Sequence, residues 1–198
     1  MNKYIDKVKD MTCEDVYAMA SARMTVALMM HADMADYFAF LSLHGFKRLH
    51  EYQYVTETVE RTKLHHDYID KHNKLIVDTF DISDRVSVIP SDWIKYTQND
   101  IDDSVTAKFV RHAFEVYRTF ETETRDLYSA IYCHMLSVGN VVDADVFKAY
   151  IDDVEHEING IDRLMHAMQN TGYDAVYIVE IQKAMHDKYK KKLHDSKL

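Results

Sequence analysis

Long stretches of helical periodicity with almost no helix-breaking residues constrain this chain more than any other feature. Apolar residues recur at helical spacing over several long segments. The 198 residues include only four glycines and one proline, the two residue types that most often interrupt helices. The sequence therefore predicts an all-α fold of long helices, organised as a single helical-bundle domain over residues 1–198.

The periodic segments divide the chain into two helical hairpins and a shorter C-terminal helix. Thr12 and Asp15 resemble a capping box at the start of the first helix, Gly45 suggests the first turn, and Asp143 can cap the fourth helix. We expect a core bundle over about residues 13–170. Its helices should cover about residues 13–44, 46–80, 102–138 and 143–170, and the fifth about residues 174–193.

The connection between the two hairpins, residues 81–100, is long for a compact domain and contains Pro90 and Trp93. A helix of 30 residues is about 45 Å long. A segment of 20 extended residues reaches at most about 70 Å. The connection can therefore run the length of the bundle and place the third helix parallel to the second. A folded loop, with simple up-and-down topology, is the alternative.

Composition disfavours several classes of partner. The net charge of −9 disfavours binding to nucleic acid. The longest apolar runs, such as residues 26–30, are too short to span a membrane, and the first 15 residues lack a signal-peptide core. We therefore expect a cytoplasmic protein.

Two further expectations concern the cysteines and the first helix. Cys13 and Cys133 form neither a disulfide framework nor a cysteine-rich zinc motif, and we expect them to be small buried apolar residues. The first helix is apolar over a wide arc, which is typical of a central helix or of one covered by a second subunit. A homo-oligomer, a dimer or larger, is therefore expected.

Four polar residues interrupt the apolar seams. Asp33 and Glu123 lie within the seams of the first and third helices, and His66 and Glu157 follow at nearly equal intervals along the second and fourth. Burying a carboxylate is costly unless a cation or hydrogen bonds compensate it. One inward polar group from each of four helices is the arrangement that a metal site inside a bundle requires.

Two segments carry a resemblance to a known family. Residues 33–42 (DMADYFAFLS) are similar to the first helix of ferritins, in which an iron-binding glutamate precedes a tyrosine-rich run, and Asp33 stands in the place of that acid. Residues 45–51 (GFKRLHE) are similar to the start of the second helix of bacterioferritins and mini-ferritins. Over about residues 16–169 the chain resembles the ferritin-like superfamily.

The resemblance implies a ferritin-like four-helix bundle with one long crossover, a short fifth helix and a di-iron or di-manganese carboxylate centre. In that family one acid comes from each of the first and third helices, and an acid-x-x-His pair from each of the second and fourth. Such a centre implies oxidoreductase chemistry with dioxygen, peroxide or Fe(II), as in a ferroxidase or a di-metal oxidase or hydroxylase.

The sequence departs from this pattern in its histidines. The only acid-x-x-His pair is Asp153 with His156, and helical geometry turns His156 away from the core. Glu157 lies at the edge of the core and is the preferred ligand of the fourth helix. A shorter first turn would bring Glu60 opposite Asp33, with a lysine at the histidine position. The candidate ligands are Asp33, His66, Glu123 and Glu157, with Glu60, Asp153 and His156 as further candidates.

Two functions remain open from the sequence. In the first, the bundle binds iron or manganese ions and oxidises Fe(II) or reduces dioxygen or peroxide. In the second, which the incomplete histidine pattern favours, a ferritin-like bundle has lost its metal centre and serves as a structural or protein-interaction module.

Overall fold

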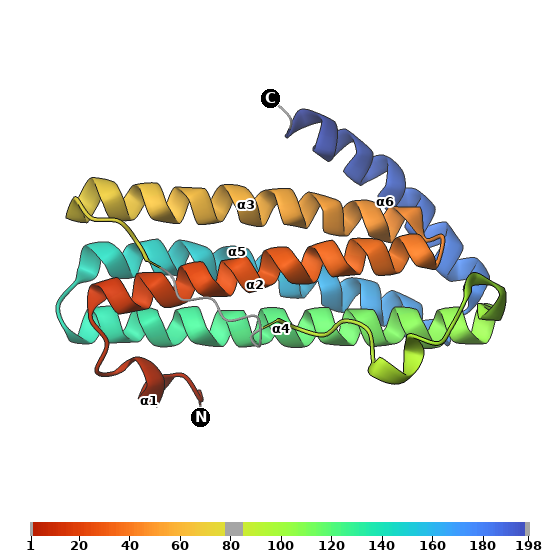
Figure 1. The fold of residues 1–198 in the computed structure, drawn as a ribbon, viewed down its shortest axis with the longest axis horizontal. Coiled ribbons are helices and arrows are strands. Elements are labelled where there is room, and N and C mark those ends of the chain that lie inside the picture. The colour runs from red at the N-terminus through yellow and green to blue at the C-terminus, as the bar shows by residue number, and fades with distance from the viewer. Residues whose placement is uncertain (1, 78–84, 197–198) are drawn as a thin grey trace.

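The computed structural model describes residues 2–77 and 85–196, and these residues form helices and connections without any strand. Four long helices lie side by side as a bundle (Figure 1). They are α2 (Cys13–Phe40), α3 (His44–His72), α4 (Asp103–Ser137) and α5 (Val141–Asn170). A short α1 (Ile5–Val8) packs against α4.

Polar side chains cap the starts of most helices. Thr12 and Asp15 form the expected capping box at α2, in which each side chain accepts the backbone N–H of the other. Asn140, rather than Asp143, caps α5, and Asp143 lies in the first turn of that helix. The remaining side-chain caps of α-helices are Asp102 at α4 and Asp174 at the C-terminal helix.

The helices of the first hairpin end earlier than expected. The turn falls at residues 41–43, with Ser42 at a φ of 58°, so Gly45 lies inside the first turn of α3 rather than at the break. Asn73 takes the left-handed conformation and ends α3, where the sequence predicts a helix to about residue 80. The final residues of that expected helix, 78–80, lie outside the described residues.

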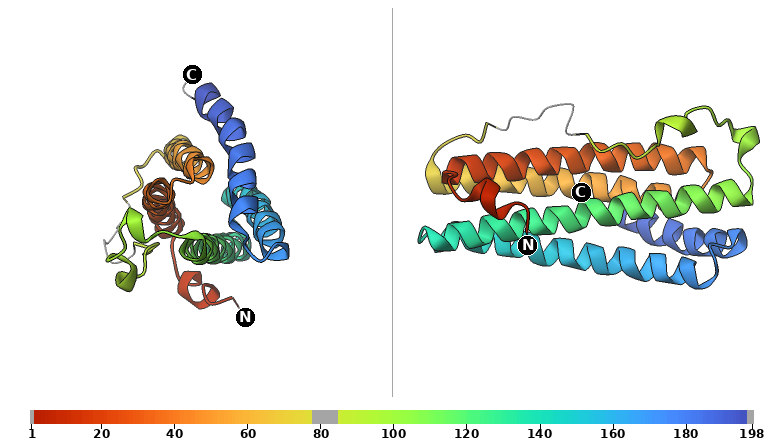
Figure 2. Two further views of the ribbon diagram at one scale, coloured as in Figure 1. Left: turned by 90° about the vertical axis from the view of Figure 1, so that its right-hand side faces the viewer. Right: turned by 90° about the horizontal axis from the view of Figure 1, so that it is seen from below.

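Residues 85–102 of the connection after α3 run along the bundle, and α4 is parallel to α3 while α5 is parallel to α2 (Figures 1 and 2). It contains two short 3-10 helices, η2 (Ser91–Trp93) and η3 (Gln98–Asp100). Trp93 stacks on Phe109 of α4 with ring centroids 4.1 Å apart, which fixes the connection against the bundle. The long-crossover reading is therefore confirmed.

The apolar core is divided into two clusters along the bundle axis. One cluster surrounds Phe38, Phe46 and Phe114, near the turn between α2 and α3. The other surrounds Tyr17 and Phe147, at the opposite end. The fully buried large side chains contribute about 1.5–3 kcal/mol each. Between the two clusters the facing segments of α3, α4 and α5 carry polar residues, and these form the candidate site.

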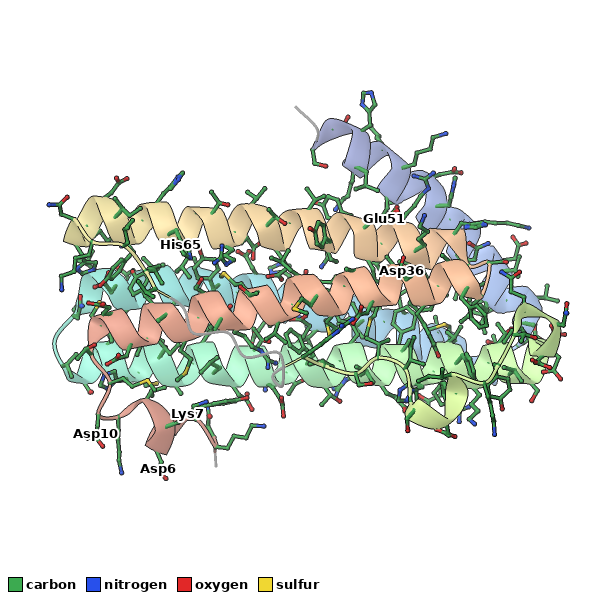
Figure 3. All side chains as sticks on the ribbon, viewed as in Figure 1. Asp6, Lys7, Asp10, Asp36, Glu51 and His65 are labelled. Carbon is green, nitrogen blue, oxygen red and sulfur yellow. The ribbon has the colours of Figure 1, made fainter. Side chains whose placement is uncertain are left out.

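The C-terminal helix α6 (Ala175–Asp195) packs across α3, and its far end stands away from the bundle (Figure 1). Asp36 and Glu51, on the side of α2 and α3 next to α6, line a groove with His186 and Lys190 (Figure 3).

No helix among the described residues is both long and apolar enough to cross a membrane. The cysteines differ from expectation, because Cys133 is exposed and Cys13 is only partly buried.

Candidate metal centre

Four glutamates from three helices lie in the polar gap between the two apolar clusters. Glu57 and Glu60 lie one turn apart on α3, Glu121 lies on α4 and Glu157 lies on α5. The four are here called the carboxylate centre. Each of them has a raised pKa, and for each the largest cause is burial, which disfavours the charged form.

Glu121 is the most deeply buried member of the carboxylate centre. Its exposed fraction is 1%. Its Oε1 atom has no hydrogen-bond partner among the described residues. Burial raises the pKa of Glu121 to about 8, with a further increase from Glu60, while Arg23 acts in the opposite direction. A buried carboxylate oxygen without a donor is costly, so this atom requires a proton or a cation.

The glutamates also act on one another. After burial, the charges of Glu121 and Glu60 raise the pKa of Glu57. The pKa of Glu157 is raised by burial and then by Glu121 and Glu57. Like-charged carboxylates that share one site hold protons more strongly than isolated ones. The charges of the four side chains therefore act on one another.

Glu60 lies toward the outer side of the carboxylate centre. Burial and the neighbouring charge of Asp153 raise the pKa of Glu60 to about 7, and Lys63 partly offsets them. The backbone carbonyl of Glu60 accepts a hydrogen bond from the Tyr150 hydroxyl at 3.4 Å. At neutral pH the Glu60 carboxyl is therefore poised between its charged and neutral forms.

Gln53, one turn before Glu57 on α3, positions the carboxylate of α5. Its Nε2 group donates hydrogen bonds to Glu157 Oε1 and, at 3.1 Å, to the hydroxyl of Tyr117. Gln53 and Tyr117 are both buried. Because one amide group holds both partners, the orientation of Glu157 is fixed relative to α3 and α4.

Helix α2 supplies a cation to this region rather than an acid. The Nε group of Arg23 donates to Thr124 Oγ1 at 2.8 Å, and Nη2 donates to the backbone carbonyl of Phe120 at 2.7 Å. The guanidinium also lies 3.6 Å from the centre of the Phe120 ring. Its charge lowers the pKa of Glu57 and Glu121 against the effect of burial.

A cavity of about 640 Å³ leads from the surface to the carboxylate centre. Glu60, Glu157 and Tyr117 line it, together with Tyr189 and Lys192 of α6. Small ions and molecules can therefore approach the glutamates between α3, α5 and α6.

Two of the sequence-predicted ligands, Glu60 and Glu157, belong to the carboxylate centre. Asp153 is exposed and lies at the cavity next to Glu60. His156 is exposed, and its Nδ1 atom lies 2.9 Å from the backbone carbonyl of Asp152, consistent with the outward orientation expected from helical geometry. The pair Asp153 and His156 therefore does not face the core together.

Three other predicted ligands lie away from the centre. Asp33 accepts two hydrogen bonds from Arg85 of the crossover connection, one of them at 2.9 Å. Glu123 is half-buried and pairs with Lys3 at 2.5 Å and with Arg23 at 3.9 Å. His66 is exposed. The expectation that these three face inward is wrong, because the buried stripes of α2, α3 and α4 pass beside them rather than through them.

The sequence reasoning missed Glu57, Glu121, Gln53 and Arg23. The family resemblance implies an acid-x-x-His pair on the second helix, whereas Glu57 and Glu60 form an acid-x-x-acid pair at the same spacing. Glu121 lies two residues before the predicted Glu123. The predicted buried face of α4 is therefore rotated by about half a turn from the observed one. Two acids three residues apart on the second helix are the sequence signal that identifies the α3 pair.

The comparisons with known proteins agree with this architecture. No protein-family model matches the sequence, and no curated protein matches it in sequence. Among solved structures, the chain is similar to a ferritin of Archaeoglobus fulgidus engineered into a closed form by site-directed mutagenesis. The TM-score is 0.69 at 14% sequence identity, and the match covers 87% of this chain and 93% of the archaeal one. The chain therefore has the ferritin-like fold that its helical segments resemble.

Proposed function

We propose that this ferritin-like protein binds one divalent metal ion, iron or manganese, at the carboxylate centre. The observation that carries the proposal is Glu121 Oε1, a buried carboxylate oxygen without a hydrogen-bond partner among the described residues, next to three further carboxyl groups. A cation held by Glu57, Glu60, Glu121 and Glu157 would compensate the burial of all four.

The chemistry of the donors fits this choice of metal. All four side chains offer carboxylate oxygens, and such oxygen donors suit hard or borderline ions such as Mn(II) and Fe(II) better than soft ones. Gln53 would keep Glu157 oriented toward the ion. No histidine belongs to the carboxylate centre as described, so the set differs from the acid-x-x-His pattern that the resemblance implies.

The charge of Arg23 favours one ion rather than two. Four carboxylates and one guanidinium carry a net charge of about −3, and one divalent ion leaves a single negative charge. A second ion would lie beside the Arg23 cation and would lack a carboxylate from α2. We therefore propose a one-metal centre in place of the expected di-metal centre.

The residues around the carboxylate centre suit oxidation chemistry at a buried ion. A bound Fe(II) ion would supply a redox-active centre able to react with dioxygen or peroxide. The cavity beside Glu60 would admit these small reactants. Ferroxidase-like activity is thus the enzymatic form of the proposal.

The direct test compares two glutamates of the same helix. Glu121→Gln removes a ligand with little change of shape, whereas Glu123→Gln changes a half-buried residue outside the centre. Calorimetric titration with Mn(II), and with Fe(II) under argon, should give about one ion per chain for the wild type and for Glu123→Gln. Glu121→Gln should weaken binding at least about tenfold. Equal binding by both variants would overturn the assignment.

Arg23 also supports a second candidate function, a metal-free structural or interaction module. Its guanidinium partly compensates Glu57 and Glu121, and protons can neutralise the remaining carboxyl groups. In that case neither Mn(II) nor Fe(II) would bind or raise the melting temperature. Glu121→Gln would then stabilise the protein, because it removes a buried ionisable group whose loss costs no metal.

A further inference from the structure

Three metal-ligating side chains from three helices converge at the end of the bundle that lies beyond the second apolar cluster. Cys13 is the first residue of α2, His72 is the last residue of α3, and Asp143 lies in the first turn of α5. Their ligand atoms lie within 4.8 Å of one another. None of the three belongs to the carboxylate centre.

The separations of the three donor atoms match those of a tetrahedral zinc site. Cys13 Sγ lies 3.7 Å from His72 Nε2 and 3.3 Å from Asp143 Oδ2, and His72 Nε2 lies 3.2 Å from the same Oδ2 atom. Typical zinc–ligand bond lengths with tetrahedral angles place sulfur about 3.5 Å from each of the other donors, and nitrogen about 3.3 Å from oxygen. All three distances agree with this geometry to within about 0.2 Å.

From this geometry we infer that Cys13, His72 and Asp143 form a Zn²⁺ site, with water as the fourth ligand. A thiolate, an imidazole and one carboxylate oxygen are a donor set that Zn²⁺ accepts readily, whereas Mg²⁺ and Ca²⁺ prefer oxygen donors alone. The ion would join the start of α2, the end of α3 and the start of α5.

Neighbouring residues hold the proposed ligands in place. Asp143 is 2% exposed. Its Oδ1 atom accepts a hydrogen bond from the Tyr17 hydroxyl at 2.8 Å, and its Oδ2 atom accepts one from Asn140 at 2.6 Å. Tyr68 packs on the His72 ring with centroids 4.6 Å apart. Such outer contacts orient metal ligands and are a regular part of zinc sites.

Without metal, a proton takes the place of the ion. The Cys13 thiol donates a hydrogen bond to Asp143 Oδ2, and burial together with that carboxylate raises the pKa of Cys13 to about 12. Zn²⁺ would displace the thiol proton and remove the repulsion between thiolate and carboxylate. Lys71 lies 3.8 Å from the other oxygen, Oδ1, and Oδ2 retains a second lone pair for the metal beside its hydrogen bond from Asn140.

Cobalt provides a probe that separates this site from the carboxylate centre. Co(II) bound by a thiolate gives an intense sulfur-to-metal charge-transfer absorption, which carboxylate ligands do not give. Titration of the reduced wild-type protein with Co(II) should produce this band at one equivalent, and Zn²⁺ should abolish it. Glu121→Gln should retain the band, so failure of the zinc site and failure of the carboxylate centre are distinguishable.

Two variants and one matched control complete the test. Cys13→Ser should abolish the charge-transfer band, and His72→Gln should weaken Co(II) binding at least about tenfold. Cys133→Ser alters the exposed cysteine and should leave the band unchanged. Circular dichroism would establish that each variant is folded. Absence of the band in the wild-type protein, or its persistence in folded Cys13→Ser, would overturn the proposal.

Discussion

Arg23 on α2 donates a hydrogen bond from Nε to Thr124 Oγ1 on α4 at 2.8 Å, and its guanidinium lowers the pKa of Glu57 and of the buried Glu121 in the carboxylate centre. In a bundle built from four helices around a polar centre, three helices thus supply negative charge and the fourth supplies positive charge. In the proposed function, the balance between them would limit the carboxylate centre to one divalent ion.

Replacement of Arg23 should change both stability and metal binding. Arg23→Gln leaves the carboxyl groups without their internal cation, so the metal-free protein should lose about 3–5 kcal/mol of unfolding free energy. Removing a positive charge should also tighten Mn(II) binding at least about tenfold. Arg118→Gln, which removes an exposed partner of Asp162, is the control and should change neither quantity appreciably. Weaker Mn(II) binding by folded Arg23→Gln would contradict the account.

Metal affinity should rise with pH. Glu60 and Glu121 have raised pKa values of about 7 and 8, so in the metal-free protein they hold protons that a metal ion must displace. Affinity for Mn(II) should increase between pH 6 and pH 8, by about tenfold per pH unit for each proton released. Calorimetry in buffers of different ionisation enthalpy measures that release directly. A pH-independent affinity would show that the two carboxyl groups are not ligands.

The same carboxyl groups determine the direction in which the stability of the metal-free protein changes with pH. A carboxyl whose pKa is higher in the folded than in the unfolded protein binds more protons when folded, so it favours folding at low pH. This contribution is complete below pH 4.5 and is lost as the pH rises toward 8. Chemical denaturation of the metal-free protein should show the loss, and Glu121→Gln should reduce it.

Two buried histidines should act in the opposite direction. His31 and His50 meet through their Nδ1 atoms at 3.0 Å, and burial lowers the pKa of both, that of His31 to about 3. The unfolded chain therefore binds protons below pH 6.5 that the folded protein does not. At pH 5.5 the two residues together should lower the free energy of unfolding by about 2.5 kcal/mol relative to pH 7.

Denaturation of suitable variants separates the histidine effect from that of the carboxyl groups. The free energy of unfolding of His50→Leu should decrease less between pH 6.5 and pH 5 than that of the wild type. His66→Gln, at an exposed position on the same helix, should leave the profile unchanged. Identical profiles for wild type and His50→Leu would mean that the pair does not remain neutral in the folded protein.

The close packing of α6 against α3 requires a residue without a Cβ atom at position 45. The N–H of Gly45 donates to Gln182 Oε1 at 2.8 Å, and a Cβ atom at this position would overlap the backbone carbonyl of Gln182. Gly45→Ala should cost about 1–3 kcal/mol and increase proteolysis of α6. Gly160→Ala, within α5 and without neighbours in the way, should instead stabilise by about 1 kcal/mol. Equal effects of the two substitutions would contradict this packing.

The sequence predicted the fold better than the site, and particular residues show why. Scarce glycine and proline, the capping residue Thr12 and the long connection after α3 each act locally or through chain length, so the bundle and its crossover were predictable. Gly45 was misread because its role is a contact with α6, far away in sequence.

The site depends on helix rotation, which the sequence specifies less precisely. A displacement of two residues turns a helical position through roughly 200°, enough to exchange the buried Glu121 for the outward Glu123. Asp33 stood in an apolar run, but its partner is Arg85 of the crossover, which periodicity cannot place. Glu157 was predictable because its angle around α5, measured from the apolar seam of the same helix, places it at the edge of the core.

The most direct test of the central claim is an anomalous difference map from crystals of the wild-type protein grown with Mn(II). One peak should lie between Glu57 and Glu60 of α3, Glu121 of α4 and Glu157 of α5, with Arg23 outside the coordination sphere. A map without a peak there at saturating Mn(II), or with the peak beside Asp33 or Glu123 instead, would contradict the account.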